Sequence, residues 1–307
     1  MSIEKLVAAV ANPVERAIEQ FSRTRNTGGL SFFVNDEVND PRYLPFLQLL
    51  QEAKKWCLPA KLELGATLSQ TMRIPREERD RITYAKVESG FYRPGEPTII
   101  FLGPLGLYRY QGLQNLLVGG LYPKANMVSI IPQDHTDGPS VARNVVDSLW
   151  HMQATIAGSV NMIEEVTKRA HYLDSPTAVV GMSMGGMATF WHAIAEGTAD
   201  EYFPLVASPS VASIFMEGGF KQLVDRWSER MLRPEYGEAF SVKGIQSKAS
   251  PAHIHPFAET GDEIVPFSFI RDDCHTLGIE VDEHPFGHIG PALQFGLVRQ
   301  LITNNFV

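Results

Sequence analysis

Residues 177–187 have the sequence TAVVGMSMGGM, in which a short apolar run leads into a Gly-x-Ser-x-Gly pattern and then into an apolar helical stretch. This pattern is informative when a buried strand precedes it and a helix follows it, because the serine then lies in a sharp, exposed turn. Small residues on both sides of Ser183 let the strand and the helix approach closely. The stretch predicts a nucleophilic Ser183, with the Met184 N–H facing a developing oxyanion. The alternative is a glycine-rich turn that only packs a helix on a sheet.

From residue 81 onward, short β-branched runs alternate with amphipathic stretches, which is typical of a mostly parallel, doubly wound sheet with helices on both faces. The expected strands are Ile82–Glu88, Thr98–Leu102, Met127–Ile131, Thr177–Gly181, Phe203–Ala207, Ala252–Phe257 and Ile279–Glu283. The expected helices are Gln111–Leu121, Val141–Arg169, Gly186–Glu196, Phe267–Leu277 and Pro291–Thr303. The sequence thus predicts an α/β fold.

Two segments fall outside this alternation. Residues 1–80 carry apolar residues at helical spacing, which predicts a helical N-terminal extension before a domain that spans residues 81–307. Residues 212–248 lie between two expected strands and are long for a plain crossover, which predicts a small helical cap over the mouth of the sheet. The apolar side chains of this cap favour either internal packing of a flap or a lid that selects a hydrophobic substrate.

A candidate acid follows the strand expected at Ala252–Phe257. The segment AETGDEIVP at residues 258–266 offers Asp262, which would orient an imidazole and stabilise its charged form. Glu259 and Glu263 are the competitors, and a turn-stabilising role is the alternative for Asp262.

A candidate base follows the strand expected at Ile279–Glu283, in the segment HPFGHIG. His288 stands just before the last amphipathic helix, whereas His284 lies too close to the strand end and favours a structural contact. A serine hydroxyl is a poor nucleophile until a base takes its proton, and an imidazole can both accept and return that proton. The order Ser183, Asp262, His288 therefore predicts a catalytic triad.

Together these features resemble the alpha/beta-hydrolase superfamily over residues 81–307. The resemblance rests on the turn at residues 181–185, the segment GDEIVP at residues 261–266 and the late Gly287-His288 pair. It implies no cofactor and acyl transfer to water. The expected function is a serine hydrolase that cleaves a carboxylic ester, thioester or lipid acyl ester through an acyl-enzyme on Ser183. The alternatives are a peptidase of the same fold and a catalytically weak binding or regulatory protein.

The segment after the strand expected at Thr98–Leu102 departs from the superfamily pattern. Members often carry His-Gly-x there, and the x residue supplies the second N–H of the oxyanion hole. This chain has Leu102 in place of the histidine and Pro104 at x. Because proline has no N–H, Pro104 cannot be that donor.

Several nearby residues could supply the second hydrogen-bond donor of the oxyanion hole. Either Leu105 or Gly106 takes over after a shift of the loop, or the side chain of Tyr108 assists the Met184 N–H. We expect Leu105 to be the second donor. The predicted substrate-binding residues are Gly103, Pro104 and Tyr108.

A metal site is an alternative use of His253 and His255. The two alternate along an expected strand, which places both on one face and permits a metal pair. No third ligand stands at a recognisable spacing, so we expect buried, hydrogen-bonded strand histidines and no metal.

The amino-acid composition and net charge indicate which classes of binding partner are expected. The 307 residues are 44% hydrophobic and 20% charged, and 27 basic against 35 acidic residues give a net charge of −8. This charge disfavours nucleic acid or an anionic membrane as partner. The first residues lack the order of a secretory signal, and no run approaches the length of a membrane span, so we expect a cytoplasmic location without stable membrane insertion. The expected partner is a small, hydrophobic ester or acyl substrate; the sequence does not predict the oligomeric state.

Overall fold

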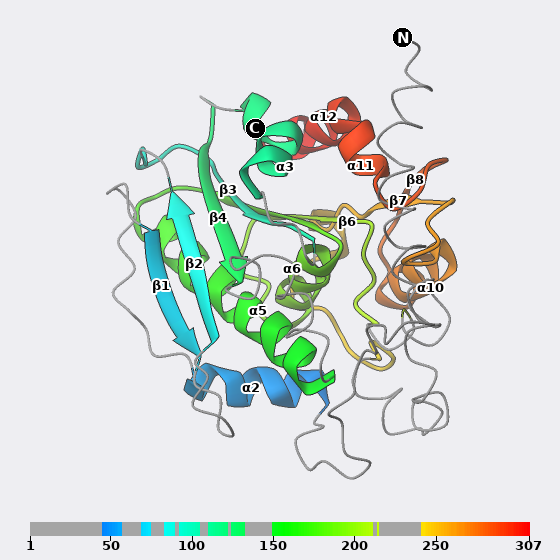
Figure 1. The fold of residues 1–307 in the computed structure, drawn as a ribbon, viewed down its shortest axis with the longest axis horizontal. Coiled ribbons are helices and arrows are strands. Elements are labelled where there is room, and N and C mark those ends of the chain that lie inside the picture. Colours follow the sequence, from blue (N-terminus) through cyan, green and yellow to red (C-terminus); the bar gives the residue numbers. More distant parts are fainter. Residues whose placement is uncertain are drawn as a thin grey trace, which may run out of the picture.

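Eight strands of the described residues form one sheet with the order β1-β2-β4-β3-β5-β6-β7-β8 (Figure 1). The strands are β1 (Ser69–Ile74), β2 (Thr83–Ser89), β3 (Thr98–Leu102), β4 (Asn126–Pro132), β5 (Thr177–Met182), β6 (Glu201–Leu205), β7 (Phe257–Glu259) and β8 (Asp282–His284). β2 is antiparallel to both β1 and β4, and the remaining neighbours are parallel. The computed structural model describes residues 45–56, 69–74, 83–89, 92–104, 110–121, 124–132, 149–210, 214 and 241–307.

Helices cover both faces of this sheet (Figure 1). The helices are α2 (Phe46–Trp56), α3 (Tyr110–Leu117), α5 (Leu149–Tyr172), α6 (Met184–Ala195), α10 (Phe267–Leu277), α11 (Gly290–Leu293) and α12 (Phe295–Asn305), with 3-10 turns η2 (Gly119–Leu121) and η5 (Pro251–His253). One apolar cluster joins one sheet face to α2, α5, α6 and α10, and a second joins the other face to α3 and α12. Among the described helices, none has the length and hydropathy needed to cross a bilayer.

Strand β3 shows why these residues form a central strand. All five of its residues are buried, and they alternate between the two apolar clusters, with Ile100 and Leu102 on one face and Ile99 and Phe101 on the other. A strand buried on both faces reads as a continuous apolar run, as this one does. The expected mostly parallel, doubly wound α/β sheet is confirmed.

The N-terminal part of the chain contributes directly to the core. The ring of Phe46 on α2 packs 4.5 Å from the ring of Trp191 on α6, measured between centroids, and Lys54 Nζ lies 2.5 Å from Glu196 Oε1. The prediction of a wholly helical extension is wrong at Ser69–Ile74, which forms β1. β1 pairs with β2 along its full length, and this pairing outweighs the local pattern.

Most of the predicted extension lies outside the described residues, and so does most of the predicted cap at 212–248. Of the cap, the structure describes Ile214 and residues 241–248. Ile214 is buried against the cluster that contains α5 and α6. The division at residue 80 and the helical cap stay predictions.

The strand expected at Ala252–Phe257 begins later in the structure. Pro251 starts a 3-10 turn over Pro251–His253, because its fixed φ suits a first helical position. This segment pairs with β6 at only two positions: Ile254 forms an isolated bridge with Tyr202, and Phe257 pairs with Leu205. The strand β7 therefore ends at Glu259, two residues later than predicted.

A buried polar network joins α5 to α6 beneath the sheet. Within it, Glu164 Oε2 lies 3.1 Å from Nε2 of the fully buried His192 and also accepts a short hydrogen bond from the Thr198 hydroxyl. Burial opposes the charge, but the hydrogen bonds from His192 and Thr198 outweigh it and lower the pKa of Glu164 to about 2. Burial lowers the pKa of His192, so this imidazole is neutral and donates its Nε2–H to Glu164.

Replacing Glu164 with alanine is expected to lower the free energy of unfolding by about 1–3 kcal/mol, because a buried N–H of His192 loses its acceptor. Since the folded pKa of Glu164 is depressed, this stabilisation is complete above about pH 4.5 and is lost as the pH falls toward about 2. Urea titrations at several pH values measure both effects. Glu165→Ala is the matched control, because the Glu165 side chain is 44% exposed and its pair with Lys168 contributes at most about 0.5 kcal/mol. Equal losses in the two variants would contradict the prediction.

Candidate active site

Ser183 occupies a strained turn between β5 and α6. Its φ of 55° and ψ of −118° are rare for a residue with a side chain, and such backbone strain costs about 1–3 kcal/mol. The surrounding structure holds the turn in place: the Ser183 N–H donates to the Leu205 carbonyl at 2.9 Å, and the Ser183 carbonyl accepts from the Met187 N–H at 2.9 Å. The strained strand-to-helix turn predicted around Ser183 is therefore present, with a partly exposed serine at its tip.

The glycines that flank Ser183 are required by close approach. A Cβ at Gly181 would lie 2.2 Å from the Gly185 carbonyl oxygen, and a Cβ at Gly185 would lie 2.4 Å from the Leu102 carbonyl oxygen. Both neighbours are backbone atoms, which cannot rotate away. The Gly-x-Ser-x-Gly spacing follows from this packing of α6 against the ends of β5 and β3.

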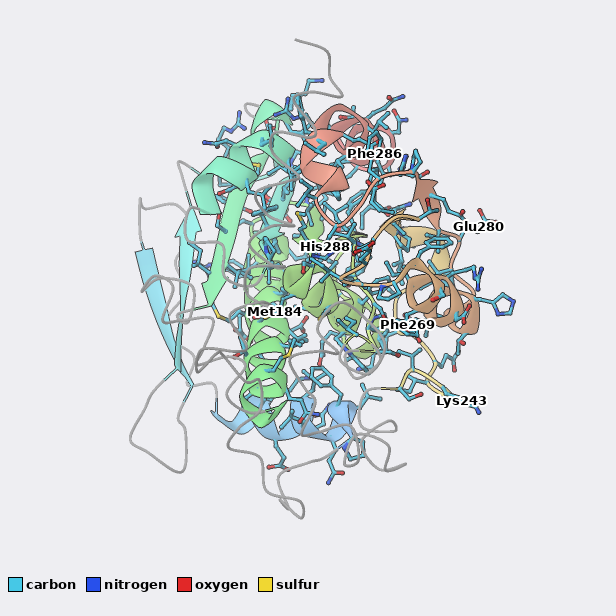
Figure 2. All side chains as sticks on the ribbon, turned by 45° about the vertical axis from the view of Figure 1, so that its right-hand side comes forward. Met184, Lys243, Phe269, Glu280, Phe286 and His288 are labelled. Atoms are coloured by element: carbon cyan, nitrogen blue, oxygen red, sulfur yellow. The ribbon has the colours of Figure 1, made fainter. Side chains whose placement is uncertain are left out.

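The structure brings Ser183, His288 and Asp262 together at the carboxyl edge of the sheet. His288 Nε2 lies 2.9 Å from Ser183 Oγ, and His288 Nδ1 lies 2.7 Å from Asp262 Oδ2. A carboxylate only accepts, so Nδ1 carries the proton and donates it to Asp262, which leaves Nε2 to accept from the Ser183 hydroxyl. Figure 2 labels His288, which precedes α11, and Met184, which begins α6.

Asp262 is well anchored. Its side chain is fully buried, and Oδ1 accepts the backbone N–H groups of Ile264 at 2.8 Å and Val265 at 2.9 Å. These bonds leave Oδ2 to His288. The turn-stabilising role and the contact with the imidazole, which the sequence analysis weighed as alternatives, are thus both present in one side chain.

The other carboxyl candidates lie elsewhere. Glu263 is exposed, and the oxygens of the buried Glu259 accept from the Phe286 N–H and the Gln294 amide. His284 makes the structural contact expected of it, because its ring stacks on Phe257 at 4.0 Å between centroids.

The region of the predicted oxyanion hole is described in part. Met184 is the first residue of α6, where backbone N–H groups have no acceptor within the helix. The carbonyl oxygens of Leu102 and Gly103 lie beside Gly185, so the loop after β3 begins next to the nucleophile turn, and Pro104 follows there without an N–H. Leu105 and Tyr108 lie outside the described residues, and so does Gly106.

The loop after β6 is held by a carboxylate that the sequence analysis missed. Asp273 on α10 accepts hydrogen bonds from the hydroxyls of Ser208 at 2.5 Å and Ser210 at 2.8 Å, and burial raises the pKa of this acid. Val206, at the start of the loop, has a φ of 45°. No local pattern reveals this anchor, because Asp273 and its partners are more than sixty residues apart. The anchored loop ends shortly before the segment that is predicted to form the cap.

His253 and His255 do not lie together on one face of a strand. Both contact the carboxylate of Glu201. His253 Nδ1 lies 2.9 Å from Glu201 Oε1, and His255 Nε2 lies 2.8 Å from Glu201 Oε2. His253 belongs to the 3-10 turn and is 53% exposed, and His255 is half-buried and precedes β7, so the expectation of buried strand histidines is wrong for both. Within the described residues, no three His, Cys, Asp or Glu side chains are grouped closely enough to hold a metal ion.

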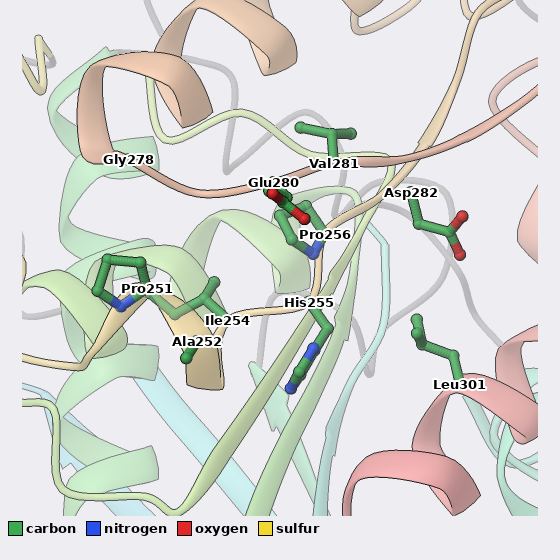
Figure 3. Close-up of a pocket in the computed structure, with 10 residues that line it drawn as sticks. All are labelled: Pro251, Ala252, Ile254, His255, Pro256, Gly278, Glu280, Val281, Asp282 and Leu301. Carbon is green, nitrogen blue, oxygen red and sulfur yellow. The ribbon is translucent and has the colours of Figure 1, made fainter.

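A cavity of about 560 Å³ lies away from the triad (Figure 3). It is lined by residues that precede β7 and β8, among them His255 and Glu280, and by Leu301 of α12. Ser183 and His288 do not line it. Since the triad lies at the carboxyl ends of the strands and this cavity at the amino ends of β7 and β8, the cavity does not receive the group that Ser183 would attack.

Comparisons with known proteins agree with this architecture. No protein-family model matches the sequence, and no curated protein matches it either. The chain is similar to the solved acetyl xylan esterase from Paenibacillus sp. R4, with a TM-score of 0.55, 14% identity and coverage of 89% of this chain and 97% of that one. A second match, acetyl xylan esterase 1 from Thermoanaerobacterium sp. JW/SL YS485, has a TM-score of 0.52 and 12% identity over 86% of this chain and 96% of that one.

A third match is an acylaminoacyl peptidase from Pyrococcus horikoshii, with a TM-score of 0.52 and 14% identity over 78% of this chain. This chain matches 42% of the length of that peptidase. Identities of 12–14% relate these proteins by architecture and not by substrate. The sheet order, the strained Ser183 turn and these matches show that the chain has the alpha/beta-hydrolase fold.

Proposed function

We propose that this protein is a serine hydrolase that cleaves a carboxylic ester, a thioester or a lipid acyl ester through an acyl-enzyme on Ser183. The observation that carries the proposal is the unbroken hydrogen-bond chain from Ser183 through His288 to Asp262, with distances of 2.9 and 2.7 Å. A nucleophile, a base within reach of it and a group that orients the base are the parts that acyl transfer requires.

The reaction proceeds in two halves. Ser183 Oγ attacks the carbonyl carbon while its proton passes to His288 Nε2, and the charged imidazole is stabilised by Asp262. His288 then returns this proton to the leaving alcohol or thiol, which departs and leaves the acyl group on Ser183. A water molecule gives a proton to His288 Nε2 and attacks the acyl carbon, and His288 protonates Ser183 as the acid product leaves.

Each half passes through an oxyanion, which needs hydrogen-bond donors. The Met184 N–H is the first donor in this proposal, because it opens α6 immediately after the nucleophile, where the helix dipole also favours negative charge. Leu105 is the proposed second donor. Gly103, Pro104 and Tyr108 are the proposed substrate-binding residues; for Gly103, the proposal is supported by its carbonyl oxygen, which lies beside Gly185.

An ester substrate is favoured over an amide by two of the three matches described above, which are acetyl xylan esterases. A hydrophobic acyl group is supported by the apolar residues of the segment predicted as a cap. The peptidase among the matches keeps amide cleavage as the second candidate.

A series of chromogenic esters from acetyl to decanoyl, with matched anilides, tests the proposal. We expect hydrolysis of esters that depends on chain length, slower release from anilides, and covalent labelling of the protein by a fluorophosphonate. Equal rates on esters and anilides would favour the peptidase. Absence of both hydrolysis and labelling would contradict hydrolase activity and favour the binding protein.

A further inference from the structure

Glu259 is a buried carboxylate that the proposed reaction does not use. It ends strand β7, has no exposed surface, and accepts hydrogen bonds from the Phe286 N–H at 2.7 Å on Oε2 and from the Gln294 side-chain amide at 2.8 Å on Oε1. Phe286 precedes His288 by two residues and Gln294 follows it by six. One carboxylate thus binds the chain on both sides of the proposed base.

The loop around His288 is also packed against this carboxylate. A Cβ at Gly290 would lie 1.8 Å from Glu259 Oε1, so a residue with a side chain fits there only if the Glu259 carboxyl group moves. The Gly290 N–H donates to the Gly287 carbonyl at 2.7 Å, which closes a tight turn around His288. The loop therefore has little room to shift while Glu259 stays in place.

Asp262 alone does not fix this loop. It holds His288 by one hydrogen bond at the tip of the side chain, whereas the backbone of the loop is held from β7 by Glu259. The same β7 segment therefore supplies both the acid that orients the imidazole and the carboxylate that anchors its backbone. Because a displacement of about 1 Å can cost about 10²-fold in rate, an anchor on the backbone contributes to the position of the imidazole in addition to the contact with Asp262.

We propose that Glu259 is a positioning residue: its carboxylate anchors the backbone on both sides of His288 and thereby keeps the imidazole in line between Asp262 and Ser183. This inference rests on the proposed hydrolase function. It adds to that function a dependence on the ionisation of a second carboxyl group.

The charge state of Glu259 follows from its surroundings. Burial raises the pKa of this carboxyl group to about 7, and the nearby charge of Asp262 also raises it, while the Phe286 N–H, His284 and the Gln294 amide oppose the rise. Among the described residues, no lysine or arginine forms an ion pair with Glu259. The ionised form accepts from both of its donors, whereas the protonated form places an O–H against one of them. The anchor is therefore half formed at about pH 7, complete well above that value, and lost as the pH falls below it.

The pH dependence of kcat/KM separates positioning from a merely structural role. In the wild type, both His288 and Glu259 must lose a proton, so the acid limb of log kcat/KM should rise with a slope between 1 and 2. In Glu259→Gln, the side chain is uncharged at every pH: its oxygen still accepts from the Phe286 N–H, while its NH₂ group faces the Gln294 amide as the O–H of protonated Glu259 would. This variant should keep kcat within about tenfold above pH 8 and show a slope of 1.

Two further variants test the anchor itself. Glu259→Ala removes both acceptors and should lower kcat by about 10- to 100-fold with little change in KM. Gln294→Ala removes one donor and should give a smaller loss, which covers the case in which Glu259→Ala fails to fold. The matched control is Glu164→Ala, which alters a buried carboxylate elsewhere and should lower stability without changing the slope. A slope in Glu259→Gln equal to that of the wild type would overturn the inference.

A proton NMR spectrum gives a readout that needs no substrate. The His288 Nδ1–H bonded to Asp262 should give a low-field resonance in the wild type and in Glu259→Gln, and this signal should weaken or vanish in Glu259→Ala. If the wild type neither labels with fluorophosphonate nor hydrolyses esters, the proposed function fails while this comparison still tests the anchor. An unchanged resonance in a folded Glu259→Ala protein would exclude the positioning role.

Discussion

Replacing Ser183 with alanine is expected to lower ester hydrolysis by about 10⁵-fold or more, and to abolish fluorophosphonate labelling, because the group that would form the acyl-enzyme is removed. The remaining rate would come from substrate binding and the oxyanion donors alone. The fold should be retained, because the hydrogen bonds that hold the turn use the backbone N–H and carbonyl of Ser183 and not its hydroxyl.

The measurement is kcat/KM on the best chromogenic ester, with labelling read by mass spectrometry at the peptide that contains residue 183. Ser159→Ala is the matched control, because Ser159 is a buried serine whose hydroxyl donates to the Thr155 carbonyl at 2.8 Å within α5. This control should keep nearly full activity and full labelling. Activity in Ser183→Ala comparable to that of the wild type would show that the hydrolysis arises elsewhere.

The central part of the fold could be predicted from the sequence because its strands and helices have clear patterns of apolar residues within each segment. The sequence predicts Thr98–Leu102 and Phe267–Leu277 with the bounds that β3 and α10 have in the structure, because both are marked by strong local patterns. Strand β1 could not be predicted in this way, because Ser69–Ile74 is a strand only through its pairing with Thr83–Ser89. β7 is a strand of three residues, too short for alternation to mark its ends.

In the candidate site, too, residues marked by local sequence could be predicted, and residues whose roles depend on distant contacts could not. Ser183, Asp262 and His288 follow in the order that this fold imposes, each just after a strand, so chain order and spacing were enough to select them. The roles of Glu259 and Asp273 depend on which distant backbone groups meet their oxygens. The sequence alone predicts Glu259 only as a competing acid, since its burial beside the His288 loop is a property of the assembled sheet.

Replacing Asp262 with asparagine is expected to lower kcat by about 10³- to 10⁴-fold with the structure intact. The reason lies in the two backbone donors of Ile264 and Val265, which require an oxygen at the Oδ1 position. The asparagine must place its oxygen there and turn its NH₂ group toward His288 Nδ1. Because that NH₂ donates, Nδ1 must become the acceptor and the proton moves to Nε2, which can then no longer accept the proton of Ser183.

This tautomer argument is tested by kcat/KM together with thermal unfolding, since the variant should unfold as a single cooperative species near the wild-type temperature. Glu263→Gln is the matched control, because it makes the same chemical change on the exposed neighbouring side chain and should leave the rate within about twofold. Fluorophosphonate labelling of Asp262→Asn should be slowed to a similar degree as hydrolysis, because both begin with the same proton transfer. If the variant instead hydrolysed esters within tenfold of the wild type, Asp262 would be a turn-stabilising residue, and the orientation of His288 would depend on the loop anchor at Glu259 alone.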